Sequence, residues 1–410
     1  MRLPPASSPW LDEDTPALEK MFREVLKSGF LTLASKTEQF EQEFNAAQGL
    51  DSRGFRSVAV SSCSSGLHIA MQIVDMMSEW SQRKKAVVVA TNTFYTDAGS
   101  VVLSGMTPCF ADTAKNSLNV SLKTVSAAFY AAQDAGYDPV AVVVTHIGGQ
   151  VVSDIADISK WCKEMGLILI EDCAHAHGCS GLDGDLLPAP AGSFGDMSVF
   201  SFYPTKVLTT GEGGTFCAKD EDVLAMAKCL RDHGKSDPKV NSHDSLGFNW
   251  RMTEQSACMG ILQSRRLSEI RKERQAIAGF YENNVLFSLA DYAEPWSIVS
   301  KNAVDSCSSW YKYVIMLHEG VVKDLGGSDR IRSSVRDKLR SDGLSLSGGV
   351  YDIPLHKQPV FEGLPCSFKA CDQVDSVIDR HLCLPVVNGM DTALCGEVAR
   401  TISGVLDSLC

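Results

Sequence analysis

The sequence predicts an α/β fold built on a mostly parallel sheet. Short runs of valine, isoleucine, leucine and alanine recur between residues 57 and 218, and stretches with helical spacing separate them. Strands without polar alternation are buried on both faces, and helices between such strands favour parallel pairing. The 410 residues are enough for two domains, which we expect at 1–260 and 261–410.

The strands of the large domain follow one another along the chain. The predicted strands are SVAV at 57–60, AVVVA at 86–90, AVVVT at 141–145 and GLILI at 166–170. Parallel sheets bind ligands at the carboxyl ends of their strands. We therefore expect the loops that follow these four strands to surround one cleft.

The second domain has a different pattern. A long helical stretch starts near Thr253 and joins it to the first domain. Beyond it, WYKYVIML at 310–317 has strand character, and TALCGEVARTISGVLDSL at 392–409 has the spacing of a final helix. This mixture predicts a smaller C-terminal α+β domain.

Composition excludes several classes of function. The net charge of −12 and the pI of about 5.3 argue against non-specific nucleic-acid binding. No apolar run reaches the roughly 18 residues of a membrane span, and we expect no signal peptide. The 14 cysteines form no CxxC pair, which favours reduced, buried thiols in a cytoplasmic protein. We expect no metal site, since clustered ligands are missing.

The stretch SSCSSGLHIA at 61–70 predicts a possible anion site. A strand ends there, small hydroxyl residues follow, and a helix begins. Backbone N–H groups at a helix N-terminus, with serine hydroxyls beside them, bind anions. Simple capping of the helix by Ser64 or Ser65 remains an alternative.

The stretch EDCAHAHG at 171–178 places two acids at the end of an apolar strand. We expect one acid at the exposed strand tip and the other in the cleft. A buried carboxylate needs a cationic partner, and the protonated ring nitrogen of a cofactor would supply one. The alternative is that Asp172 caps the next helix. His175 and His177 have no third ligand at zinc spacing.

The stretch FSFYPTK at 200–206 has the pattern of a strand followed by a turn. Ser201 and Lys206 can then reach the same pocket. A lysine amine held there can form a Schiff base with an aldehyde, because burial or a cationic neighbour lowers its pKa. An ordinary surface lysine is the alternative.

In this order, the three motifs resemble those of fold-type I enzymes that use pyridoxal phosphate. The chain resembles the DegT/DnrJ/StrS family of sugar aminotransferases over nearly its whole length. The segment NTFYTDAGS is similar to the family string TF-x-A-T-A-N-A. Other similar segments follow in the family's order, namely HIGGQ, LRDHG, GFNWRMTEQSACMGILQ, PLHKQPVF and LCLPVVNGMD.

The resemblance implies a role for each matching residue. Lys206 would hold pyridoxal 5′-phosphate, and Asp172 would pair with its pyridinium nitrogen. Phe94 would stack on the ring, and His175 would lie near the phenolic oxygen. The cofactor's phosphate would contact three serines, Ser64, Ser65 and Ser201.

The resemblance also implies a homodimer with shared active sites. Asn249 matches an asparagine that reaches the cofactor phosphate of the neighbouring subunit. Arg251 and His233 would lie near the same interface. Arg251 and His356 are candidate substrate residues.

The implied reaction moves an amino group from an amino acid, expected to be glutamate, to a keto sugar. The sugar is expected to be nucleotide-linked, and the product would enter amino-sugar biosynthesis. Lys206 would act as general base and acid. Three alternatives stay open: a sugar dehydratase, whose relatives carry histidine in place of Lys206; an aminocyclitol or other non-sugar aminotransferase; and a non-catalytic binding or regulatory protein.

The chain departs from the family's pattern in places. Cys63 stands where the family usually has glycine, and Val207 replaces a common asparagine. Extra residues are expected near 78–85, 180–192 and 297–309. They would either reshape the substrate entrance or form neutral surface insertions.

Overall fold

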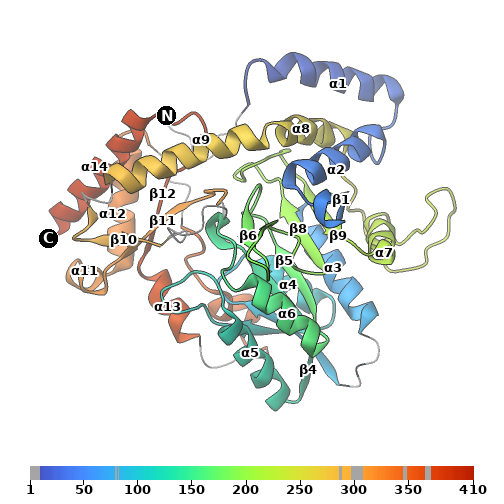
Figure 1. Cartoon of the computed structure of the whole chain (residues 1–410), viewed down its shortest axis with the longest axis horizontal. Coiled ribbons are helices and arrows are strands. Elements are labelled where there is room, and N and C mark those ends of the chain that lie inside the picture. The colour runs from blue at the N-terminus through green and yellow to red at the C-terminus, as the bar shows by residue number, and fades with distance from the viewer. Residues whose placement is uncertain are drawn as a thin grey trace.

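The structure is a computed structural model of the chain, and its principal feature is a seven-stranded sheet with the order β1-β9-β8-β5-β4-β2-β3 (Figure 1). It describes residues 10–78, 81, 83–285, 289–296, 308–344, 349–364 and 371–410. The seven strands are β1 Arg56–Val60, β2 Lys84–Ala90, β3 Thr107–Ala111, β4 Tyr137–Thr145, β5 Ile168–Asp172, β8 Met197–Ser201 and β9 Gly214–Ala218.

The sheet is mostly parallel, as the sequence predicts. Only β9 runs against its neighbours, because it pairs antiparallel with both β1 and β8. The strand predicted at 166–170 lies two residues further along, at Ile168–Asp172. It extends through both acids because Glu171 and Asp172 pair with Ser198 and Val199 of β8.

Helices cover both faces of this sheet. One face packs against α3 Cys63–Met77, α4 Tyr95–Leu103 and α7 Glu221–Arg231, and the other against α5 Leu122–Asp134 and α6 Ile155–Met165. Successive strand residues point to opposite faces, so Val87 and Val89 join the first core while Val88 joins the second. The result is the expected αβα layering.

Four helices run across one end of the large sheet and lead to the C-terminal part (Figure 1). They are α1 Asp14–Ser28, α2 Ser35–Gln48, α8 Glu254–Arg265 and α9 Leu267–Phe280. Thr253 caps α8, so the predicted helix start is confirmed. The single long helix expected there is divided at Arg266 into α8 and α9. The predicted division at 260/261 falls within α8.

The C-terminal part has its own antiparallel sheet of β10 Ala293–Pro295, β11 Tyr313–Leu317 and β12 His381–Leu384. Its core is closed by α12 Ser328–Ser341 and α14 Thr392–Leu409. The final helix at 392–409 is thus confirmed, and the strand predicted at 310–317 is present but begins at Tyr313. Shorter elements are α11 Glu319–Asp324, α13 Asp372–Ile378, η1 Asp51–Arg53, η2 Ile147–Gly149, η3 Tyr281–Val285, η4 Leu355–Lys357 and η5 Pro359–Phe361.

One of the three expected insertions is seen in full. Residues 180–192 contain a hairpin of β6 Ser180–Leu182 and β7 Pro188–Pro190. Residues 79, 80 and 82, and residues 297–307, lie outside the described residues.

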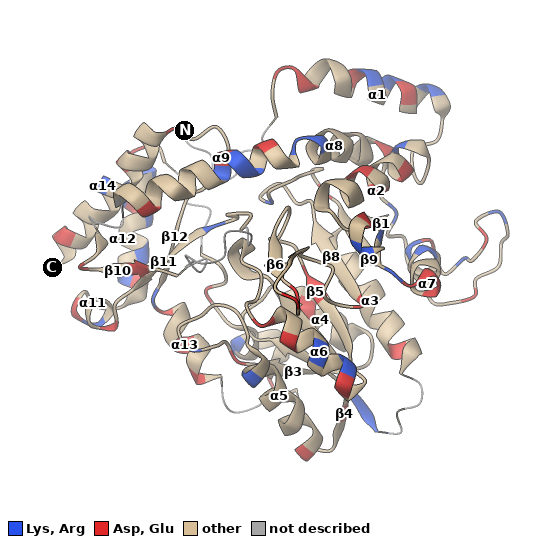
Figure 2. Ribbon diagram, in the orientation of Figure 1, with Lys and Arg blue, Asp and Glu red and all other residues tan. Residues whose placement is uncertain are grey.

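Three general properties concern the charged helices, the cysteines and the apolar character of the helices. Acidic and basic residues are interspersed along α1, whereas α12 is mostly basic (Figure 2). None of the described cysteines forms a disulfide, and nine of them are buried. Within the described part of the chain, no helix has the length and apolar character of a membrane span.

Candidate active site

A pocket of about 380 Å³ opens at the carboxyl ends of the parallel strands. The loops after β1, β2, β5 and β8 line it, together with residues from the C-terminal part. Three of the four predicted loops therefore meet there. The loop after β4 does not line the pocket, although Thr145 at the end of that strand contacts Asp97 beside it.

The N-terminus of α3 supplies one wall. The Ser62 hydroxyl accepts the backbone N–H of Ser65, and the Ser65 hydroxyl accepts that of Ser62. This capping box leaves Ser64 at the pocket and turns the buried Ser65 toward the cap. Cys63 also lines the pocket, with its sulfur 3.9 Å from Asp172 Oδ1.

Asp172 is buried at the end of β5 and lines the pocket. Its Oδ1 accepts the backbone N–H of Ala174 at 2.8 Å. Burial raises the pKa of this carboxyl, while the Ala174 N–H and the charge of Lys206 act in the opposite direction. Turns follow β5, so the alternative that Asp172 caps a helix is wrong.

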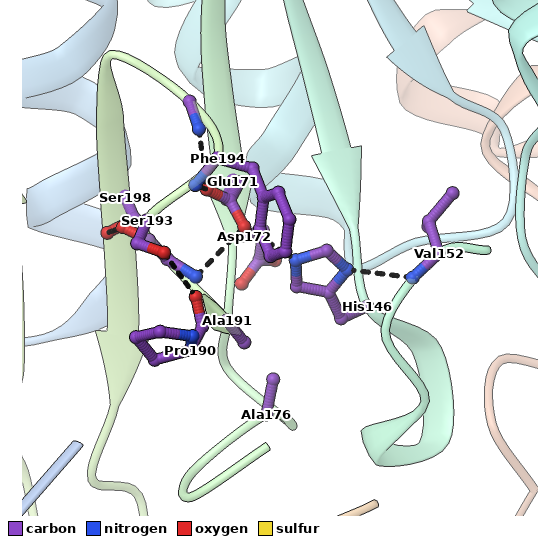
Figure 3. Close-up of polar contacts among 12 residues, drawn as sticks. His146, Val152, Glu171, Asp172, Ala176, Pro190, Ala191, Ser193, Phe194 and Ser198 are labelled. Carbon is purple, nitrogen blue, oxygen red and sulfur yellow. Dashed lines mark hydrogen bonds and ion pairs between the residues drawn. The ribbon is translucent and has the colours of Figure 1, made fainter. Parts of the chain in front are cut away.

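Glu171 is also buried, so the expectation that one of the two acids is exposed is wrong. Its carboxylate accepts the backbone N–H groups of Gly192, Phe194 and Gly195 at 2.7–2.9 Å (Figure 3). These donors, from a loop twenty residues away, stabilise the buried charge.

His146 completes the surroundings of Glu171. Its Nδ1 accepts the Val152 N–H, which leaves Nε2 to donate to Glu171 at 2.9 Å (Figure 3). Cys173 lies close enough that the three side chains offer possible metal ligands within 4.8 Å of one another. Backbone N–H groups already use both oxygens of Glu171, however, so we assign these residues to the core.

Lys206 lies in the turn after β8, where its backbone N–H donates to Tyr203 at 2.9 Å. The side chain is half-buried and lines the pocket, with Nζ 4.9 Å from the centre of the Tyr311 ring. Ser201, buried at the end of β8, lines the same pocket. The two residues therefore meet as the sequence predicts.

Aromatic rings form the remaining walls. Phe94, at the start of α4, is half exposed toward the pocket. His175 stacks on Tyr311 with ring centres 4.1 Å apart, and the hydroxyl of Tyr351 lies 3.5 Å from His175 Nε2. Burial, reinforced by the charge of Lys206, holds the pKa of His175 well below its ordinary value, so this imidazole is neutral.

Four predicted residues lie away from the pocket of their own chain. Asn249 is exposed, and its backbone bridges to Asp232. The guanidinium of Arg251 is paired with the carboxylate of Asp232. His356 Nδ1 is hydrogen-bonded to the Thr91 hydroxyl at 2.7 Å. His233, also predicted near an interface, is exposed.

Sequence reasoning missed several residues at or beside the pocket, among them Tyr311, Tyr351 and Asp97. Tyr311 lies in a predicted strand. Its aromatic neighbours Trp310 and Tyr313 were the sequence feature that could have indicated a ring-lined wall. Tyr351 has the unusual φ of +76°, and the glycines before it mark a turn. Asp97 was detectable as a lone acid in an apolar helix.

The pocket suits a cofactor with an anionic group, a cationic ring and an aldehyde. Ser64 and the α3 N-terminus match the anion, Asp172 matches the cation, and Lys206 matches the aldehyde. His175 Nδ1 is buried and has no partner among the described residues. A polar ligand atom would satisfy it. These residues therefore fit pyridoxal phosphate.

The fold and this pocket define an α/β transferase of the aminotransferase class. The chain belongs to the DegT/DnrJ/EryC1/StrS aminotransferase family, whose model matches residues 12–403. The resemblance read from the sequence, the fold class and the enzymatic nature of the protein are thereby confirmed, and the idea of a non-catalytic scaffold loses its support.

Individual relatives match over most of the chain. The spore coat polysaccharide biosynthesis protein SpsC of Bacillus subtilis is 31% identical over 395 residues, covering 93% of this chain and 92% of its own. The dTDP-4-dehydro-2,3,6-trideoxy-D-glucose 4-aminotransferase of Saccharopolyspora spinosa is 29% identical, with 92% and 90% covered. Helicobacter pylori PseC, an aminotransferase involved in the biosynthesis of pseudoaminic acid, shares the fold, with a TM-score of 0.81, 22% identity and 99% of each chain covered.

Proposed function

We propose that this enzyme uses pyridoxal phosphate to move an amino group from an amino acid, with glutamate as the expected donor, to a nucleotide-linked keto sugar. The observation that carries the proposal is that Lys206 and Asp172, distant in sequence, line one pocket with Ser64 and Ser201. The relative from Saccharopolyspora spinosa, named as a dTDP-sugar aminotransferase, supports the substrate class.

Each wall of the pocket has a part in holding the cofactor. Ser64, Ser201 and the N-terminus of α3 would bind the phosphate. Asp172 would hold the ring nitrogen, and Phe94 would cover one ring face. When bound, the cofactor supplies an aldehyde carbon that accepts the amino group and a ring that withdraws electrons.

Lys206 would do the proton transfer. Its amine would take a proton from the reacting carbon of the amino acid and return one to the carbon of the keto sugar. The neutral His175 adds no second positive charge beside it. Tyr311 and Tyr351 cover this side of the pocket and limit access of water.

The test compares Lys206→Ala with Lys219→Ala. Lys219 is exposed and lies over the Phe55 ring, away from the pocket. Because one amine performs both proton transfers, we expect Lys206→Ala to lose on the order of 10³-fold or more in activity, while Lys219→Ala stays close to wild type. Amino-group transfer is measured with a panel of keto sugars, each with and without a nucleotide. A Lys206→Ala enzyme that keeps a tenth of the activity would refute the proposal.

We also propose that the chain works as a cytoplasmic homodimer. Leu246 and Phe248 are exposed beside Asn249, and Phe30 and Leu31 are exposed before α2. Exposed apolar side chains of this kind suit a contact with a second copy. The absence of disulfides among the described cysteines, most of them buried, suits a reducing compartment.

A further inference from the structure

Asp97 is a second buried carboxyl beside the pocket. It lies in the first turn of α4, and its side chain is fully buried. Its Oδ2 is hydrogen-bonded to the hydroxyls of Thr93 and of Thr145, the latter at 2.7 Å. Its Oδ1 has no N–H or O–H donor among the described residues. One oxygen is therefore satisfied as an acceptor, and the other is left without a donor.

Asp172 is the group that Asp97 faces. The two side chains are 0% and 2% exposed, and Thr145, whose hydroxyl is hydrogen-bonded to Asp97, lies beside Asp172 in the neighbouring strand. Two carboxylates in contact away from water do not both ionise, so such a pair shares a proton. Burial, followed by the charge of Asp172, raises the pKa of Asp97 well above its ordinary value.

The surrounding groups decide which carboxyl keeps the proton. The charge of Lys206 and the Ala174 N–H both favour the ionised form of Asp172. The other titratable neighbours of the pair, Cys63 and Tyr351, are neutral, because burial and the nearby carboxylates raise their pKa values. The hydrogen bonds that the described residues donate to Asp97 come from the two threonine hydroxyls, which carry no charge. The proton therefore belongs on Asp97 Oδ1.

We propose that Asp97 is a neutral carboxylic acid that donates a hydrogen bond to Asp172 and so keeps Asp172 ionised to receive the cationic ring nitrogen of the cofactor. Asp97 is thus a positioning residue that acts through Asp172. The part played toward the cofactor rests on the proposed function. The hydrogen bond itself is a property of the protein alone.

The sequence adds a second observation. In the family string TF-x-A-T-A-N-A, the fifth position is threonine, and here it is Asp97. A carboxylate would bring a second negative charge against Asp172. A protonated carboxyl brings a donor instead, as a threonine hydroxyl does. The neutral form is the one that lets an acid occupy this position.

The first experiment uses the cofactor-free protein. Infrared difference spectroscopy at pH 7 should show the carbonyl stretch of a protonated carboxylic acid in wild type and in Asp172→Asn. The same stretch should be missing in Asp97→Asn. If Asp97→Asn keeps the stretch, or if wild type lacks it, the proposal is overturned.

The second experiment measures pyridoxal phosphate affinity against pH. Hydrogen bonds to charged groups are worth about 1.5–3 kcal/mol, which corresponds to about 1–2 pKa units. In Asp97→Leu, which removes the donor, the acidic limb of the profile should therefore move up by about 1–2 pH units. Asp97→Asn restores a donor and should leave the limb within about 0.5 unit. If Asp97 were ionised, Asp97→Asn would remove a negative charge and move the limb down, and that result would contradict the proposal.

The two experiments separate the two proposals. A wild-type protein that binds no pyridoxal phosphate would defeat the proposed function, while the infrared result would still decide the state of Asp97. If Asp97→Leu does not fold, the comparison of Asp97→Asn with wild type decides both measurements.

Discussion

Glu171 and Asp172 are adjacent in sequence but serve opposite sides of the sheet. Successive residues of a strand point to opposite faces, so Asp172 faces the pocket while Glu171 faces the loop at 192–195. Both carboxylates can stay buried because each accepts its own backbone N–H groups, Asp172 from Ala174 and Glu171 from the loop at 192–195. The loop that Glu171 holds leads directly into β8, the strand that carries Ser201 and precedes Lys206.

Glu171→Gln tests this support at a single residue. Glutamine replaces one accepting oxygen with an amide donor, so at least one backbone N–H at 192–195 loses its partner. We expect the free energy of unfolding to fall by about 3 kcal/mol, measured by urea denaturation. Glu164→Gln, on the exposed face of α6, should change it by less than about 0.5 kcal/mol. Equal effects of the two substitutions on the free energy of unfolding would show that the Glu171 carboxylate does not stabilise the loop at 192–195.

The chemistry of single residues was largely predictable from the sequence. Ser64, Phe94, Asp172, His175, Ser201 and Lys206 all line the pocket, because each follows a strand whose carboxyl end must meet the others. The burial of Glu171 was not predictable. Its partners lie at 146 and at 192–195, and no local pattern indicates that backbone N–H groups there will point at one carboxylate.

At the scale of elements, the contact between β9 and the start of α3 fixes the predicted phosphate site. A Cβ on Gly214 would lie 2.5 Å from the carbonyl carbon of Ser62 and 2.6 Å from the nitrogen of Cys63. No side chain fits there without a backbone shift. Glycine at 214 thus lets β9 lie close to the capping box.

Gly214→Ala should displace the N-terminus of α3. Because the clash is with backbone atoms, we expect a loss of about 1–3 kcal/mol in stability. The same loss of geometry should weaken cofactor binding about tenfold, since a displaced helix end loses about 1.4 kcal/mol or more of anion binding. Titration with pyridoxal phosphate measures the second effect. Gly184→Ala is the matched control, because nothing lies within 4 Å of a Cβ at that position. Unchanged affinity in Gly214→Ala would show that α3 does not bind the cofactor.

Element boundaries were less predictable than element types. The apolar pattern ends at Ile170, yet β5 continues to Asp172 because its acids are paired through distant contacts. The long helix beyond Thr253 divides at Arg266, which contacts Asp14 in α1. Both differences come from tertiary contacts, which act on the ends of elements and leave their periodicity intact.

At the scale of the whole molecule, the proposed dimer makes a prediction that a monomer does not. If Asn249 completes the site of the partner subunit, Lys206→Ala and Asn249→Ala chains should complement each other. After mixing, unfolding and refolding, half of the dimers are mixed, and each carries one intact site. About a quarter of the wild-type activity should return.

The control for this complementation mixes Lys206→Ala chains with chains that carry both substitutions. No intact site can form in that mixture, so no activity should return. If the first mixture also stays inactive while Asn249→Ala alone is impaired, each chain builds its site by itself and the shared-site proposal fails.

The pocket is lined by residues from two separate parts of the chain. Lys206 and Asp172 are anchored by strands of the large sheet, whereas Tyr311 and Tyr351 come from segments more than a hundred residues later. The residues proposed to carry the chemistry and the two rings that cover them thus come from separate parts of the chain. Changes in the later part can therefore reshape one wall of the pocket while Lys206 and Asp172, which the large sheet anchors, stay where they are.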